Sequence, residues 1–141
     1  MCKTVKRHRV YRIVATKSFE TVDGRFVEKG EPGGWIESAL NLSQDGRCWI
    51  DDDAVVLGDG SVLDNALVAD EVMCEGILQD NAIARGKACI EFGAICRDNT
   101  LVCDNALIKE GAIVMDNATV AEDAIVCKNA VIGDDTYYTS R

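Results

Sequence analysis

The chain has 141 residues, of which 48% are hydrophobic and only 6% aromatic, and its net charge is −9. This length predicts one domain with its own core, and the few aromatic residues favour thin, regular layers of aliphatic side chains and alanine. We find no apolar stretch typical of a membrane span or a secretion signal. Seven cysteines without such a signal are typical of reduced thiols, so we expect a cytoplasmic protein without a membrane partner.

The charge is unevenly distributed along the chain. Residues 1–49 carry nine Lys/Arg and six Asp/Glu, a net charge of +3, whereas residues 50–141 carry six and eighteen, a net charge of −12. Binding along a nucleic acid requires a dense array of Lys and Arg. The acidic part of the chain therefore argues against a nucleic-acid partner and favours a basic protein.

Short strands are expected at the N-terminal end. Residues 9–15 alternate between apolar and polar side chains, which predicts a strand. Residues 19–22 and 25–28 flank Asp23-Gly24, a two-residue turn signal that predicts a β-hairpin. We expect residues 1–43 to form a β-cap and an entry segment, because a stack of strands needs its open end covered.

A six-residue repeat dominates residues 44–137. An aliphatic residue recurs every six positions, and Ala or another small residue follows it four positions later; the one slip is the step from Cys74 to Leu78. Six residues suit one short strand and one tight corner, so three repeats can close a triangular coil with the aliphatic residues inside. The pattern predicts an all-β fold, a parallel β-helix over residues 44–137, followed by a short tail at 138–141. The aliphatic positions are Ile50, Val56, Val62, Val68, Cys74, Leu78, Ala84, Ile90, Cys96, Val102, Ile108, Val114, Val120, Val126 and Ile132.

In this repeat the chain resembles the hexapeptide-repeat family, whose fold is a left-handed parallel β-helix that often assembles into trimers. The preceding block is similar to the entry segment of hexapeptide-repeat proteins from bacteria and their phages; it reads Gly30-Glu-Pro-Gly-Gly-Trp-Ile-Glu-Ser38, then Asn41-Leu-Ser-Gln44 and Cys48-Trp-Ile50. The resemblance implies a left-handed helix with a β-hairpin cap. It also suggests a mobile-element origin, in which case the compartment is the cytoplasm of the host.

One of the three corner columns of such a helix is nearly uniform. It holds Asp-Asn pairs at 64–65, 80–81, 98–99 and 116–117 and an Asp pair at 134–135. At the usual strand spacing of ~4.8 Å these carboxylates form a ladder, whose members are Asp64, Asp80, Asp98, Asp116 and Asp134. Two interpretations remain open. Each Asp bonds the amides of its own turn and nothing else, or the ladder binds cations or a basic protein surface.

The residue before each inward aliphatic points outward and is often apolar, which gives three stripes. Strand propensity accounts for part of this pattern, but stripes of this length are also typical of interfaces. We predict a homo-oligomer, a trimer or a dimer. Our choice of interface is the stripe with the least charged flanks, which consists of Trp49, Leu67, Ile83, Leu101 and Tyr137. The second stripe holds Val55, Met73, Cys89, Leu107 and Ile125, and the third Ile77, Ile95, Ile113 and Val131.

Residues with catalytic or metal-binding chemistry are scarce. Enzymes of the hexapeptide-repeat family use a histidine as general base, and related zinc enzymes bind the metal through several histidines, whereas this chain has only His8, outside the repeats and without a nearby carboxylate in sequence. Cys48, Cys74 and Cys96 fall at inward positions, and no CxxC pair occurs. We predict no catalytic residue, no metal site and no cofactor.

Three functions of different classes remain. The first is a non-enzymatic, oligomeric interaction protein, which in a phage would bind or inhibit a host macromolecule. The second is a binder of a small anionic ligand, such as a nucleotide or sugar nucleotide, in clefts between subunits, with Arg85 and Arg97 as anion contacts. The third is a divergent hexapeptide-repeat transferase. The sequence favours the first.

Overall fold

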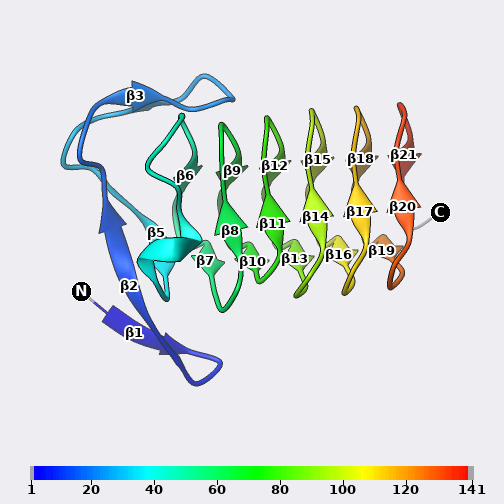
Figure 1. Ribbon diagram of the computed structural model, residues 1–141, viewed down its shortest axis with the longest axis horizontal. Coiled ribbons are helices and arrows are strands. Elements are labelled where there is room, and N and C mark those ends of the chain that lie inside the picture. Colours follow the sequence, from blue (N-terminus) through cyan, green and yellow to red (C-terminus); the bar gives the residue numbers. More distant parts are fainter. Residues whose placement is uncertain (1, 140–141) are drawn as a thin grey trace.

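The structure is a computed structural model that describes residues 2–139, most of them in a stack of short parallel strands (Figure 1). Three sheets run along the stack and enclose one core. We name each sheet after the first of its two-residue strands. Within residues 2–139 the only helical element is the single 3-10 turn η1 (Ala39–Asn41), and no helix is long and apolar enough to cross a membrane. The predicted all-β parallel helix is confirmed.

The β6 sheet contains six parallel strands and the β8 sheet five, while the β7 sheet continues into the N-terminal strands. The β6 sheet consists of β6 (Trp49–Ile50), β9 (Leu67–Val68), β12 (Ile83–Ala84), β15 (Leu101–Val102), β18 (Thr119–Val120) and β21 (Tyr137–Tyr138). The β7 sheet consists of β5 (Pro32–Ile36), β7 (Val55–Val56), β10 (Met73–Cys74), β13 (Cys89–Ile90), β16 (Leu107–Ile108) and β19 (Ile125–Val126), preceded by β1 (Cys2–Val5) and β2 (His8–Val14). The β8 sheet consists of β8 (Ser61–Val62), β11 (Ile77–Leu78), β14 (Ile95–Cys96), β17 (Ile113–Val114) and β20 (Val131–Ile132).

The core consists of the predicted inward positions. Every one of them from Ile50 to Val126 is fully buried, and the alanines at the companion positions from Ala54 to Ala124 are buried beside them. Stacking places like on like, as in the pairing of Ile50 with Val68 and of Ala84 with Val102. The hydrophobic effect of this continuous column is what holds such short strands together.

The predicted slip in the repeat is present in the structure. Only Glu75 and Gly76 separate β10 from β11, where other neighbouring strands of the repeat have four residues between them. A Cβ atom at Gly76 would lie 2.5 Å from the carbonyl oxygen of Ala94 and 2.8 Å from a methyl group of Ile90. The shortened corner therefore requires glycine.

The stack begins earlier than the predicted residue 44. Strand β5 already pairs in parallel with β7, and Leu42 bridges to Val62 of the β8 sheet, so the first coil runs from β5 through η1 to β6. In this coil η1 and the single bridge of Leu42 take the place of a strand, and Asn41 holds this segment in position. Its side chain accepts from the amides of Glu37 and Ser38 and donates to the carbonyls of Gly58 and Gly60.

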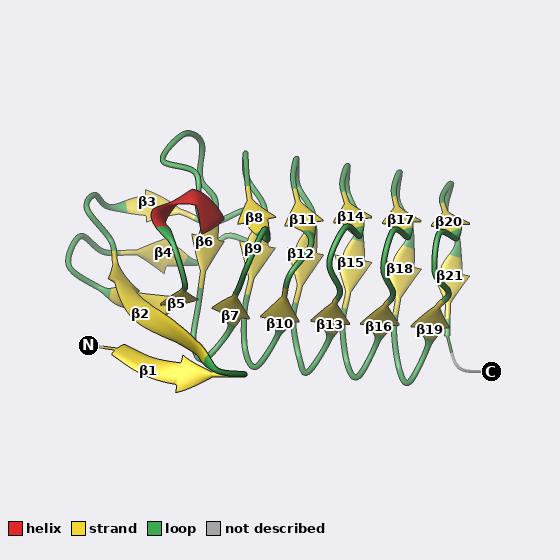
Figure 2. Cartoon of the chain, turned by 60° about the horizontal axis from the view of Figure 1, so that its bottom comes forward, coloured by secondary structure: helices red, strands yellow, loops and turns green. Residues whose placement is uncertain are grey.

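Two antiparallel hairpins precede the coils (Figure 2). Strand β2 (His8–Val14), which corresponds to the strand predicted at 9–15, pairs with β1 (Cys2–Val5) on one side and with β5 on the other. The second hairpin joins β3 (Phe19–Glu20) to β4 (Phe26–Val27) where the sequence predicts one. It lies beside the first coils (Figure 1), because its apolar side chains pack on the outer face of the β6 sheet.

Candidate binding surfaces

The acidic ladder is built into the backbone of the helix. All five aspartates have φ between 56° and 60°, the left-handed region. The Oδ2 atom of each of the first four accepts from the backbone amide of the next aspartate along the column. The N···O distances are 3.0 Å for Asp80 to Asp64 and for Asp98 to Asp80, and 2.8 Å for Asp116 to Asp98 and for Asp134 to Asp116. The first interpretation is thus corrected in one respect: each carboxylate bonds the next coil rather than its own turn.

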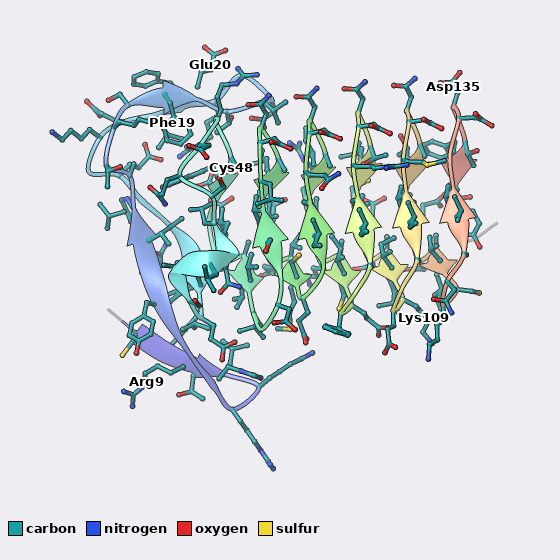
Figure 3. The ribbon with its side chains drawn as sticks, viewed as in Figure 1. Arg9, Phe19, Glu20, Cys48, Lys109 and Asp135 are labelled. Atoms are coloured by element: carbon teal, nitrogen blue, oxygen red, sulfur yellow. The ribbon has the colours of Figure 1, made fainter. Side chains whose placement is uncertain are left out.

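A second ladder runs beside the first. Amide groups of the adjacent asparagines donate from coil to coil, starting with Asn65 to Asn81 at 3.2 Å and ending with Asn117 to Asp135 at 3.1 Å. Figure 3 shows the side chains of this corner column along the edge of the helix that ends at Asp135. A bond of the same kind also occurs in another column, where the backbone amide of Glu122 donates to Oδ2 of Asp104. This arrangement gives the acidic column a structural role, and its binding of a basic partner stays a prediction.

The stripe that we chose as an interface is partly covered by the chain itself. Trp49 and Leu67 are each 3% exposed, because the β3–β4 hairpin and Ala15 pack on them. The expectation that these two residues contact another subunit is wrong. Ile83 and Leu101 are partly exposed, Tyr137 is exposed, and a role for these three stays a prediction.

Ion pairs fix the hairpin in this position. Asp23 lies in the turn of the β3–β4 hairpin, and its carboxylate accepts from Arg85 of the helix at 3.0 Å. Arg25 of the same hairpin lies 3.2 Å from the buried carboxylate of Asp51. Partial burial opposes ionisation of Asp23, but hydrogen bonds from Thr21 and the Arg25 backbone and the charge of Arg85 together lower its pKa. The hairpin is therefore attached by charge as well as by apolar contact.

The β7 sheet is also covered at its beginning. Val10 of β2 is fully buried in a cluster with Trp35, Val55 and Leu57, and Val5 packs against that cluster. Lys6, in the turn between β1 and β2, extends the cover with a 3.5 Å ion pair to Glu75. Two of the three outer faces are thus partly occupied by the N-terminal hairpins.

The β8 sheet is the face on which neither hairpin packs. The outward residue of its first strand is Ser61, and those of its four later strands, which we call the isoleucine face, are Ile77, Ile95, Ile113 and Val131. The next outward position along each strand is Gln79, Arg97, Met115 or Gly133, so the face and this flank carry a single charge. Phe92, at the adjoining corner, is 53% exposed. The sequence shows this stripe but not that the other two are partly covered.

The two predicted anion contacts do not form one site. Arg85 follows β12 of the β6 sheet and is paired with Asp23, whereas Arg97 follows β14 of the β8 sheet. The guanidinium of Arg97 lies 3.2 Å from the sulfur of Met115 and 3.9 Å from the carboxylate of Asp98. Of these two arginines, Arg97 is the one that borders an apolar face left uncovered by both hairpins.

His8 has a partner that its sequence neighbours do not suggest. Its Nδ1 atom lies 2.8 Å from Oε2 of Glu37, and Oε1 of Glu37 accepts from the amide of Gly58 at 2.7 Å. The hydrogen bond from His8 is the main cause of a lowered Glu37 pKa, with that from Gly58 second. The pair joins the cap to the first two coils.

The three buried cysteine thiols are poor nucleophiles in this environment. Burial raises the pKa of Cys48 to about 11 and that of Cys74 to about 12, and it also raises the pKa of Cys96. These groups stay protonated at neutral pH, whereas the thiolate is the reactive form. Among residues 2–139 no group of three or more His, Cys, Asp or Glu side chains is arranged to hold a metal ion.

No model of a protein family matches the chain, and no curated protein is significantly similar to it.

Proposed function

We propose that this chain is a left-handed member of the hexapeptide-repeat family that acts as a non-enzymatic interaction protein and pairs with a second copy through the isoleucine face. The observation that carries the proposal is that this face is apolar, nearly uncharged and left free by both N-terminal hairpins. In a chain of net charge −9, two copies approach most easily through a surface without carboxylates.

The geometry favours a dimer over a trimer. One face that meets its own copy across a two-fold axis makes a closed dimer, whereas a ring requires two different complementary surfaces. Four strands at ~4.8 Å spacing make a face about 19 Å long. With a width of about three residues, its projected area is far below the roughly 800 Å² that each partner buries in a stable complex. We therefore expect a weak dimer that forms at high protein concentration.

The dimer leaves the acidic corners available for a further partner. In the helix region, where carboxylates outnumber cationic side chains, a basic protein surface is the favoured macromolecule, and in a phage this would be a host factor. His8 is hydrogen-bonded to Glu37, and the buried thiols are protonated at neutral pH. Both observations support binding as the function rather than catalysis by these groups. Arg97, at the margin of the isoleucine face, supports a small anionic ligand between two copies as the second candidate function.

Three matched charge substitutions test the proposal. Ile95→Lys, Leu101→Lys and Leu107→Lys each place a cation at a half-buried outward position on a different sheet. Sedimentation equilibrium at several hundred micromolar should show a dimer for the wild type, Leu101→Lys and Leu107→Lys and a monomer for Ile95→Lys. A monomeric wild type, or equal effects of the three substitutions, contradicts the proposal.

A further inference from the structure

A cavity of about 230 Å³ opens at the N-terminal end of the helix. It lies between the end of β2 and the first coil, whose labelled residue Cys48 is seen beneath the β3 hairpin in Figure 3. Strand β6 is an edge strand of its sheet, so no other strand among residues 2–139 pairs with its outer edge. In the β7 sheet, β2 pairs with β5 and so covers the corresponding edge. The cavity lies at the part of this end of the helix that β2 leaves uncovered.

The walls of the cavity are mainly apolar. The apolar lining residues come from β2, β3, β5, the segment after η1, and β6; they are Ile13, Phe19, Ile36, Leu42 and Trp49. Phe19 and Trp49 are fixed by an edge-to-face contact with ring centroids 5.5 Å apart, so this wall is preformed. Preformed apolar walls with a few polar groups are typical of small-molecule sites.

The charge of the cavity is opposite to that of the protein. No Asp or Glu lines it, and Lys17 is its one charged residue. Within residues 2–139 the Lys17 ammonium has no ion-pair partner, and Thr16, Ser43 and Gln44 supply hydrogen-bonding groups to the lining. In a chain of net charge −9, a cavity lined by one unpaired cation favours an anionic ligand.

We propose that this cavity binds a small monocarboxylate with an apolar body, whose carboxylate pairs with Lys17 and whose body lies against Phe19 and Trp49. A cavity of about 150 Å³ holds benzene, so 230 Å³ suits one ring with a short side chain or a chain of about eight carbons. An extended peptide strand is the competing occupant, because the free edge of β6 offers backbone groups for pairing. The lone cation and the limited volume favour the small acid.

The test uses the full-length protein labelled with ¹⁵N and titrated with sodium octanoate. Octanoate should shift the amide resonances of residues 13–19 and 39–49 and leave those of the isoleucine face unchanged. Octan-1-ol, which has the same body without the charge, should bind more weakly. Shifts confined to other segments at 10 mM octanoate, or no shifts, overturn the proposal, and so does equal affinity for the alcohol.

A pair of lysine variants tests the role of the charge. Lys17→Gln should weaken octanoate binding about fivefold, the worth of one exposed ion pair, and leave octan-1-ol binding unchanged. Lys29→Gln removes an exposed lysine of the same cap region that does not line the cavity, and it should leave both affinities unchanged. Equal effects of the two variants on octanoate binding contradict the proposal, and the spectra themselves show that each variant is folded.

Discussion

The ring of Phe19 meets that of Trp49 edge to face, with centroids 5.5 Å apart and an interplanar angle of 74°. This contact joins a hairpin of the cap to the first strand of the β6 sheet. The same hairpin covers Leu67, so the beginning of the β6 sheet is not available for contact with another subunit.

Removing the Phe19 ring should loosen the hairpin. Phe19→Ala loses the aromatic contact and part of the apolar cluster, and we expect it to lower the free energy of unfolding by about 2 kcal/mol and to shift tryptophan emission to the red. Phe26→Ala, on the same hairpin but 62% exposed, is the control and should change neither quantity. Urea unfolding followed by fluorescence measures both, and equal losses in the two variants contradict the assigned contact.

The aspartate ladder should tolerate loss of charge better than loss of its acceptor. Asp98→Ala removes the acceptor for the amide of Asp116 at a residue with φ of 59°, and we expect it to cost about 2 kcal/mol. Asp98→Asn keeps an acceptor and tolerates this conformation, so its cost should be below about 1 kcal/mol. Denaturant unfolding of the two variants measures the difference. Asp59→Ala controls for removal of an exposed carboxylate outside the ladder, and a larger loss in Asp98→Asn than in Asp98→Ala contradicts this role.

Asn41 should be among the most sensitive polar residues. Asn41→Ala removes the acceptor for the amides of Glu37 and Ser38 in the first coil and the donor to two carbonyls in the second coil. The amide of Glu37 keeps the carbonyl of Val56 as a partner, and we expect a loss of about 3 kcal/mol. Leu40→Ala, at the adjacent position of η1, removes a side chain that is 85% exposed and should cost little. Thermal unfolding by circular dichroism compares the two, and a similar melting temperature for both variants would count against the proposed role of Asn41.

Acid should weaken the attachment of the cap. The pKa of Glu37 is lowered by His8 and Gly58, and the net effect on Asp23 is also a lowered pKa. A carboxyl group with a lowered folded-state pKa contributes stability that is present above its unfolded pKa and is lost as pH falls through the folded value. We therefore expect unfolding free energy to fall as pH decreases from about 5 to 3. Glu37→Gln should show a shallower decline, and a decline identical to that of the wild type contradicts the His8–Glu37 linkage.

The sequence predicts the helix well because one residue in six must enter a narrow core. Positions such as Val68 and Ile108 follow directly from that period, and the slip after Cys74 is visible as a shortened step. The corners follow less completely: turn chemistry suggests the asparagines for the left-handed conformation, whereas Asp98 and its equivalents adopt it. At Asp98 this conformation accompanies a bond from the carboxylate to the amide of Asp116 in the next coil, a contact between coils that turn propensity alone does not describe.

The arrangement of the cap was not predictable from the sequence. The turn between β1 and β2 places Lys6 and Arg7 at φ values of 48° and 68°, although neither residue is typical of such a turn. The strand β1 was therefore missed. The hairpin over residues 19–27 was predicted, but its packing on Trp49 depends on contacts between distant segments. Because that packing covers Trp49 and Leu67, we propose the isoleucine face as the interface instead of the β6 sheet.

The most direct test of the proposed pairing is an isotope-filtered nuclear Overhauser experiment on a millimolar mixture of isoleucine-methyl-labelled and unlabelled protein. Contacts between the two copies should involve the methyl groups of Ile77, Ile95 and Ile113, and should be absent for Ile83 and Ile125 on the other two sheets. Intermolecular signals from Ile83 or Ile125 alone, or none from any isoleucine, contradict assembly through the isoleucine face.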